Sequence, residues 1–176
     1  MAFTLKQLSD IEEIRILKHR YFRAIDTADK ELLATLFTED VECAYNGGTY
    51  RVSFKGRDAM LEFLANSFHS GAVAMHHGHM PEITPTGDNT AKGIWYLEDI
   101  FIDLEKDDHT FGTAIYTDTY RCEGGVWKIE STHYDRVVEV LTKFSDLKGR
   151  VTVQRLATTG RKPEERTDNS AFITWG

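Results

Sequence analysis

The sequence predicts an α+β fold in which N-terminal helices pack on one face of a strongly curved, mostly antiparallel sheet. In the first part of the chain apolar residues recur at helical spacing, whereas from about residue 72 they alternate with a period of two. Turn residues separate the alternating segments, which is typical of an antiparallel meander. Helices that precede such a meander indicate an α+β layout.

Three segments show the spacing of amphipathic helices. The first is predicted over residues 10–26, because Ser9 and Glu12 form a capping-box pattern and apolar residues then recur every three or four positions. Residues 29–37 and 57–69 show the same spacing.

Strands are predicted for most of the remaining chain. β-Rich residues flank Asn46-Gly47-Gly48, which is a strong signal for a hairpin. Four longer β-rich segments follow, separated by turn residues, at residues 72–84, 89–104, 110–122 and 125–140. We expect residues 1–145 to form one domain and residues 146–176 to be a C-terminal extension, either a free tail or a contact with another copy.

Composition narrows the class of protein. The 28 acidic residues outnumber the 21 basic ones, and the formal charge of −7 disfavours binding to nucleic acid. The longest apolar runs are too short to cross a membrane, and the first residues lack the features of a secretory signal. Cys43 and Cys122 have no metal-binding or disulfide spacing, so we expect a reduced, cytoplasmic protein.

The segment "AMHHGHMPEI" contains His76, His77 and His79 within four positions. On a strand, alternation places His76 on one face and the other two histidines on the opposite face, so the three imidazoles cannot share one metal ion. His77 and His79 suit a weak two-histidine site, but surface histidines are the commoner occurrence. We therefore predict no metal site.

Polar residues among predicted core positions are the candidates for chemistry, because apolar pockets contain few polar groups. Asp26 ends the first helix, where a carboxylate is unfavourable unless a partner such as a histidine compensates it. A helix-end acid exposed to water is the simpler explanation. Asp99 shares a strand face with Trp95 and Leu97, although alternation alone leaves open whether this face points inward.

Four motifs together resemble one known family. "KHRYFRAID" at residues 18–26, "MHHGHMPEIT" at 75–84, "GIWYLED" at 93–99 and "YTDTY" at 116–120 resemble the SnoaL-like branch of the nuclear transport factor 2-like superfamily. Within this branch the likeness is greatest to the bile acid 7α-dehydratases. Scytalone dehydratase and the lindane dehydrochlorinase share the broader layout of a helix-borne aspartate and a strand-borne histidine.

The resemblance implies a cone-shaped α+β barrel around a deep, mostly apolar pocket, without a metal or organic cofactor. It assigns a catalytic dyad to His76 and Asp26, and further catalytic positions to Tyr21, Tyr45 and Asp99. Relatives form homo-oligomers, either trimers or dimers. Positions for binding a hydrophobic substrate are then expected at Trp95, Leu97, Tyr116, Asp118 and His79.

We therefore predict a dehydratase that eliminates water from a hydrophobic hydroxylated ring compound, such as a steroid or a polyketide. The imidazole of His76 would remove a proton, since imidazole titrates near neutral pH, and Asp26 would orient it. Tyr21, Tyr45 and Asp99 would assist the leaving group or a carbonyl. Two alternatives stay open: an isomerase that transfers protons like ketosteroid isomerase, and a small-molecule-binding protein of the same fold without activity.

Overall fold

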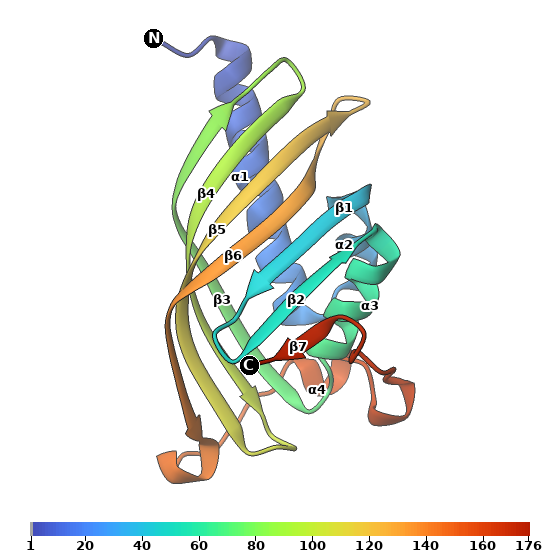
Figure 1. Cartoon of the computed structure of the whole chain (residues 1–176), viewed down its shortest axis with the longest axis vertical. Coiled ribbons are helices and arrows are strands. Elements are labelled where there is room, and N and C mark those ends of the chain that lie inside the picture. The colour runs from blue at the N-terminus through green and yellow to red at the C-terminus, as the bar shows by residue number, and fades with distance from the viewer. Residues whose placement is uncertain (1) are drawn as a thin grey trace.

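The computed structural model describes residues 2–176, and its main helices and strands follow the predicted order (Figure 1). The N-terminal part contains α1 (Leu5–Thr27), α2 (Lys30–Leu36), β1 (Phe37–Asn46), β2 (Tyr50–Lys55) and α3 (Arg57–Ser67). The long strands follow as β3 (Ala72–Pro85), β4 (Thr90–Asp103), β5 (Asp108–Glu123) and β6 (Val126–Lys143). The C-terminal part has two short 3-10 turns, the one-turn helix α4 (Leu156–Thr159) and the short strand β7 (Ile173–Trp175).

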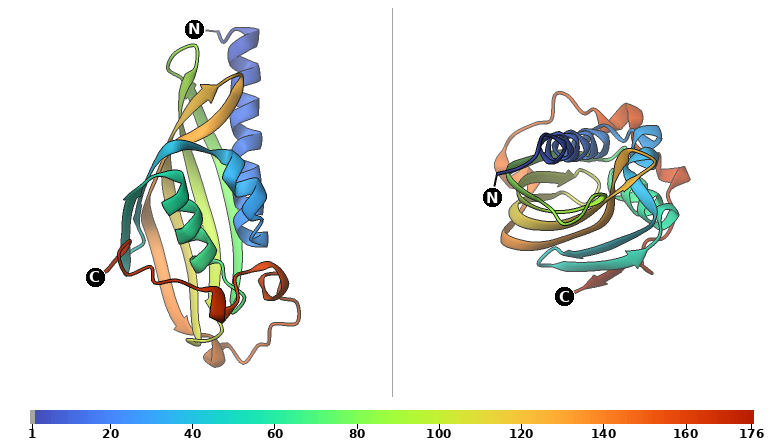
Figure 2. Two further views of the ribbon diagram at one scale, coloured as in Figure 1. Left: turned by 90° about the vertical axis from the view of Figure 1, so that its right-hand side faces the viewer. Right: turned by 90° about the horizontal axis from the view of Figure 1, so that it is seen from above.

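All seven strands belong to one sheet, in the order β3-β4-β5-β6-β1-β2-β7. Neighbouring strands are antiparallel except β1 and β6, which run parallel. The sheet curves strongly, and α1 and α3 lie on its concave side (Figure 2). The predicted α+β fold is confirmed, with a sheet that stays open because β3 and β7 are its two edges.

Helix α1 is longer than predicted at its N-terminus. It begins at Leu5 because Thr4 caps it: the Thr4 hydroxyl accepts a hydrogen bond from the backbone N–H of Gln7, and the Gln7 side chain accepts one from the backbone N–H of Thr4. This capping box replaces the predicted one at Ser9 and Glu12. The helix ends at Thr27, because the next residue, Ala28, adopts a left-handed conformation with φ of 49°. Asp26 therefore lies in the last turn of α1.

A buried ion pair fixes α1 to β5. Lys18 and Asp118 are both inaccessible to solvent, and their charged atoms are 2.7 Å apart. Tyr120 also donates a hydrogen bond to Asp118, at 2.8 Å, and accepts one from the indole of Trp95, at 2.9 Å. Burial lowers the pKa of Lys18, although the carboxylate of Asp118 opposes this effect. Breaking such a pair would leave an uncompensated buried charge, so Asp118 stabilises the fold. Trp95 belongs to the same buried network through its hydrogen bond to Tyr120.

The C-terminal segment packs on its own chain, so it is not the free tail that was one of the two expectations. Strand β7 extends the sheet by pairing with β2. Arg161 binds the carboxylate of Glu62 on α3, which lowers the pKa of Glu62 to about 2. Arg166 makes two hydrogen bonds to Glu105, at 2.7 and 2.9 Å. These contacts hold residues 161–175 over one end of the concave face.

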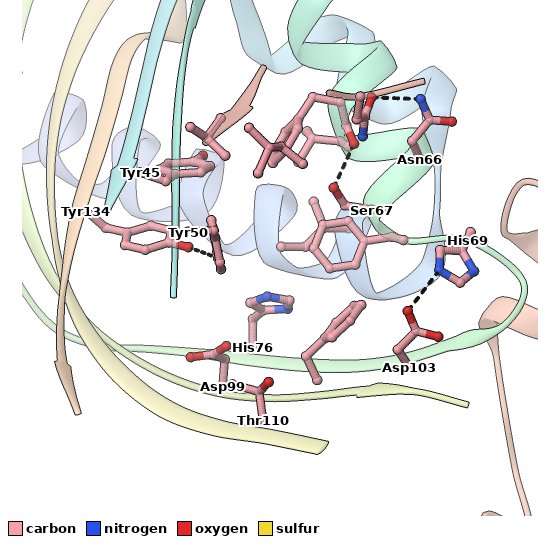
Figure 3. Close-up of a pocket in the computed structure, with 18 of the residues that line it drawn as sticks. Tyr45, Tyr50, Asn66, Ser67, His69, His76, Asp99, Asp103, Thr110 and Tyr134 are labelled. Carbon is pink, nitrogen blue, oxygen red and sulfur yellow. Dashed lines mark hydrogen bonds and ion pairs between the residues drawn. The ribbon is translucent and has the colours of Figure 1, made fainter. Parts of the chain in front are cut away.

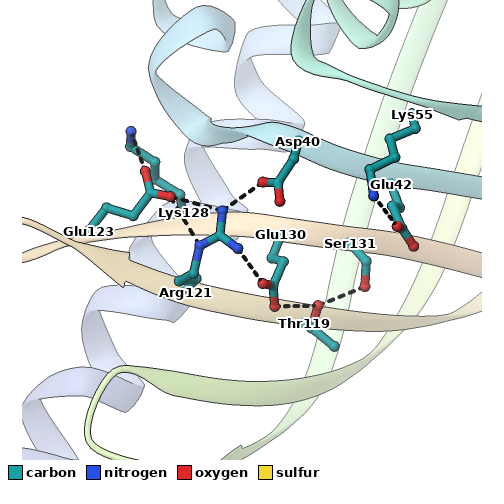
Figure 4. A network of polar contacts seen from close by, with 9 residues as sticks. All are labelled: Asp40, Glu42, Lys55, Thr119, Arg121, Glu123, Lys128, Glu130 and Ser131. Atoms are coloured by element: carbon teal, nitrogen blue, oxygen red, sulfur yellow. Dashed lines mark hydrogen bonds and ion pairs between the residues drawn. The ribbon is translucent and has the colours of Figure 1, made fainter.

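A network of ion pairs lies on the surface where β1 approaches β5 and β6 (Figure 4). Arg121 is its centre, with contacts of 2.6 Å to Asp40, 2.7 Å to Glu130 and 3.0 Å to Glu123. Because these groups are exposed, each pair contributes little to stability, about 0–1 kcal/mol. Within residues 2–176 no helix combines the length and the apolar character that crossing a membrane requires, and Cys43 and Cys122 are both free.

Candidate active site

A cavity of about 470 Å³ lies between the concave face of the sheet, the helices α1 and α3, and the C-terminal segment. This volume falls within the range of about 300–1,000 Å³ that is usual for small-molecule sites. Figure 3 shows Tyr45, Tyr50 and Tyr134 at one side of the cavity and His69 and Asp103 at the other. His76 lies between these two groups.

The predicted partners His76 and Asp26 are hydrogen-bonded. The distance from His76 Nδ1 to Asp26 Oδ1 is 2.6 Å. The second carboxylate oxygen of Asp26 accepts a hydrogen bond from the backbone N–H of His76, at 3.1 Å. A carboxylate only accepts hydrogen bonds when ionised, so Nδ1 carries the hydrogen and Nε2 is left as a proton acceptor. The contact also compensates a negative charge at the C-terminal end of α1.

Two aromatic rings hold the imidazole plane of His76. Phe22 stacks on it, with an interplanar angle of 11°, and Phe68 meets it edge-on, with ring centroids 5.3 Å apart. Phe22 in turn depends on Gly78, because a Cβ at this position would lie 2.2 Å from the Phe22 ring. The side chain of His76 is only 9% exposed, so both its position and its orientation are restricted.

Four tyrosines form two hydrogen-bonded pairs beside His76. The hydroxyls of Tyr21 and Tyr45 are 3.1 Å apart, and those of Tyr50 and Tyr134 are also hydrogen-bonded. Tyr45 stacks on Tyr134, with ring centroids 4.4 Å apart. Burial raises the pKa of all four side chains, so each remains a neutral phenol at ordinary pH. In each pair only one hydrogen lies between the hydroxyls, which leaves the other available to a ligand.

Asp99 lines the cavity, but its carboxylate is paired. Arg136 on β6 donates two hydrogen bonds to it, the second at 2.9 Å, and both side chains are at least 90% buried. Sequence analysis assigned Asp99 a direct part in assisting the leaving group or a carbonyl, and it named no partner for this carboxylate. Both oxygens of Asp99 are occupied by the guanidinium of Arg136, so the structure gives Asp99 the position of an ion-pair partner in the cavity wall.

Arg136 is one of the cavity residues that sequence analysis missed. Asp99 and the neighbouring tyrosines raise its pKa despite its burial. Its Nε is a buried atom without a hydrogen-bond partner among residues 2–176. A signal was present in the sequence, since Arg136 lies two residues after Tyr134 on the same strand and therefore faces the same side.

The end of the cavity opposite the tyrosines is charged. His69 and Asp103 are both more than 90% buried, and Lys106 and Arg166 also line this end. The Nδ1 of His69 accepts a hydrogen bond from the backbone N–H of Gly71, at 3.1 Å. Burial, and the nearby Arg166 in addition, lowers the pKa of His69, which favours its neutral form. None of these four residues was a predicted site residue.

Residues 6–133 match the sequence model of the SnoaL-like domain. The chain belongs to the SnoaL-like family. The resemblance inferred from the four sequence motifs is thus confirmed at the level of the family.

Solved structures share the SnoaL-like fold at low sequence identity. A hexachlorocyclohexane dehydrochlorinase of type 2 is 19% identical, with a TM-score of 0.71, over 78% of this chain and 92% of its own. A candidate scytalone dehydratase from Novosphingobium aromaticivorans is 21% identical, with a TM-score of 0.67, over 94% of this chain and 100% of its own. A nuclear transport factor 2-like protein with a cystatin-like fold, from the same organism, is 23% identical, with a TM-score of 0.59, over 76% of this chain and 85% of its own.

Not all predicted substrate-binding positions of this SnoaL-like chain reach the cavity. Leu97 and Tyr116 line it, as expected. Trp95 and Asp118 do not, because both are fully enclosed in the core between α1 and the sheet. His79 is 44% exposed and lies on the face of β3 opposite His76. The prediction for His79 is wrong because this residue lies on the outer face of the sheet. Trp95 and Asp118 lie on the same face as Leu97 and Tyr116, but at a place along their strands where α1 covers the sheet. A sequence motif does not reveal where along a strand the cavity ends.

Proposed function

We propose that this SnoaL-like chain is a cofactor-independent lyase that eliminates water from a hydrophobic hydroxylated ring compound, such as a steroid or a polyketide. One observation carries the proposal: the imidazole of His76 is hydrogen-bonded to Asp26 through Nδ1 and lies at the wall of an aromatic cavity. A buried base with an orienting carboxylate is the arrangement that proton abstraction requires.

In the proposed reaction, Nε2 of His76 removes a proton from the carbon next to the one that bears the hydroxyl. The electrons of the C–H bond form the new double bond, and the C–O bond breaks. The imidazolium is stabilised by Asp26, and it returns the proton to the departing hydroxyl, which leaves as water. The protein therefore ends each cycle in its starting protonation state, and a positioned acid–base pair of this kind contributes about 10²–10⁴-fold in rate.

The tyrosine pairs supply neutral hydrogen-bond donors for the reacting oxygen. The free hydrogen of the Tyr21–Tyr45 pair is available to the departing hydroxyl or to a carbonyl that enolises. Asp99 acts in this scheme as the partner of Arg136, whose positive charge stabilises negative charge that develops on the substrate. The fixed position of these groups avoids reorganisation during the reaction.

Two further observations favour elimination from a ring compound. Aromatic side chains form much of the cavity wall, and they suit flat apolar rings. Two proteins of similar fold are named a dehydrochlorinase and a candidate dehydratase, and both names describe elimination reactions.

The test is the mass of the product from a panel of hydroxylated steroids and polyketides. We expect a product lighter by one water, and we expect His76→Gln and Asp26→Asn each to slow its formation at least about 100-fold. His133→Gln is the matched control, because it removes an exposed imidazole on β6. A product of unchanged mass would identify an isomerase instead, and binding without turnover in the wild type would identify a binding protein.

We also propose that the chain forms a homo-oligomer through the outer face of its sheet. Large apolar side chains are exposed there on β5 and β6, and Phe111 pairs directly with Val140 across the two strands. Such patches on soluble proteins are typical of association surfaces. Light scattering after gel filtration should give the mass of a dimer or trimer, and Val140→Glu should reduce it to that of one chain. A single-chain mass for the wild type would refute this proposal.

A further inference from the structure

A second group of ionisable side chains lies on the outer face of the sheet, away from the cavity. His77 and His79 are two residues apart on β3, and Glu98 on β4 is the direct antiparallel partner of His77. One donor atom from each of these three residues lies within 4.8 Å of the other two. His79 Nε2 and Glu98 Oε2 are 3.8 Å apart.

These distances suit a metal ion. First-row divalent ions bind imidazole nitrogen at about 2.0–2.1 Å and carboxylate oxygen at about 2.0–2.2 Å. Two ligand atoms on one ion are therefore less than about 4.4 Å apart. The His79–Glu98 contact already meets this limit. The donor atom of His77 comes within this distance of the other two by side-chain rotation alone, because residues on one face of paired strands have neighbouring Cβ atoms.

The three side chains are available to a ligand. Among residues 2–176, none of them donates or accepts a hydrogen bond, and Glu98 pairs with no lysine or arginine. Both His79 and Glu98 are 44% exposed. The backbone below them is fixed by the β3–β4 ladder, so binding requires no change in the fold.

We propose that His77, His79 and Glu98 form a binding site for one divalent transition-metal ion, with its remaining coordination positions open to water. Two imidazole nitrogens and one carboxylate oxygen favour ions such as Zn²⁺, Ni²⁺ and Cu²⁺. Mg²⁺ and Ca²⁺ prefer sites made entirely of oxygen ligands. The site differs from the dyad in position as well as chemistry, since His76 faces the cavity on the opposite side of β3.

The bound ion would connect β3 to β4. β3 is an edge strand of the sheet, and it carries His76, whereas β4 carries Asp99. A ligand that binds only the folded chain raises the midpoint of thermal unfolding as its concentration increases. The ion is therefore expected to stabilise the edge of the sheet without entering the cavity.

Calorimetric titration of metal-free protein with Zn²⁺ at neutral pH tests the site. We expect one ion to bind per chain, and Zn²⁺ to raise the midpoint of thermal unfolding. His77→Gln, His79→Gln and Glu98→Gln should each lower the affinity about tenfold or more, since loss of even an outer partner of a metal ligand costs 10–100-fold. The three positions are on the surface, and circular dichroism will show whether each variant is folded.

Two control variants complete the experiment. His133→Gln removes an exposed histidine outside the cluster, and His76→Gln removes the histidine of the cavity. Both should bind Zn²⁺ as tightly as the wild type. Wild-type affinity in the folded cluster variants would overturn the proposal, as would loss of binding in His76→Gln, because that result would place the ion in the cavity.

Discussion

Replacement of Asp26 by asparagine is the substitution with the most specific expected effect. Asp26 accepts hydrogen bonds from both the ring and the backbone N–H of His76. The two hydrogen bonds go to different oxygens of the carboxylate, and a carboxamide keeps only one of these oxygens, so in the present geometry it cannot accept both. If its NH₂ group faces the ring, Nδ1 must become the acceptor and Nε2 must carry the hydrogen. His76 would then be in the tautomer that cannot remove a proton.

The size of the effect follows from these contacts. Loss of the oriented base should lower kcat about 10²–10⁴-fold, which corresponds to about 3–5 kcal/mol of transition-state stabilisation. The fold should survive. Loss of one charge-assisted hydrogen bond costs about 1.5–3 kcal/mol, and removal of a carboxylate from the C-terminal end of α1 returns about 0.3–1 kcal/mol. The net loss of about 0.5–2.7 kcal/mol should lower the midpoint of unfolding by about 1–11 °C.

Two assays measure these effects separately. Product formation under saturating substrate gives kcat, and the ¹⁵N chemical shifts of the His76 ring report which nitrogen carries the hydrogen. The expected result is low kcat together with hydrogen on Nε2 in Asp26→Asn. Wild-type kcat in a folded variant, or low kcat with an unchanged tautomer, would refute this reasoning.

Three further predictions concern the surroundings of the dyad. Arg136→Gln leaves Asp99 buried and unpaired, so it should destabilise the protein by about 3–5 kcal/mol in urea unfolding, and the added change Asp99→Asn should restore part of the loss. The reasoning fails if the double variant is less stable than the single one. Gly78→Ala forces the Phe22 ring away from β3, so it should cost about 1–3 kcal/mol and lower kcat, whereas unaltered kcat would show that Phe22 does not position His76. His69 has a pKa lowered by burial, so the unfolded chain binds more protons below about pH 6.5 and the free energy of unfolding should decrease as the pH falls. His69→Gln should flatten this dependence, and an equal slope in the variant would contradict the assignment.

The arrangement of helices and strands was predictable because it depends on local pattern. The period of apolar residues and the turn signals identified the three main helices, the hairpin and the four long strands. The predicted start of α1 was wrong because the helix is capped five residues earlier, by Thr4 and Gln7. Both residue pairs have the spacing of a capping box, and this pattern alone does not reveal which pair caps the helix.

The candidate site was predictable only where a motif identified it. His76 and Asp26 meet as expected, although they are fifty residues apart in sequence. The partners of Asp99 and Asp118 were not predictable, because Arg136 and Lys18 are brought to them by strand register and helix packing. These partners determine the place of each carboxylate. Asp99 lines the cavity as the partner of Arg136, whereas Asp118 is part of the core as the partner of Lys18.

The C-terminal segment shows a similar limit. Its polar sequence has no periodicity, so sequence analysis expected a tail or a contact with another copy. Arg161 and Arg166 instead bind acidic residues that lie about 60 to 100 positions earlier in the chain. Long-range ion pairs of this kind leave no local pattern, and the charged end of the cavity was missed for the same reason.

Mass spectrometry of the product from wild-type and Asp26→Asn protein, with one hydroxylated ring substrate, tests the central claim most directly. The account predicts that wild-type protein forms a product lighter by one water and that the variant forms it at least about 100-fold more slowly. Equal rates of water loss by the two proteins, or a wild-type product of unchanged mass, would contradict it.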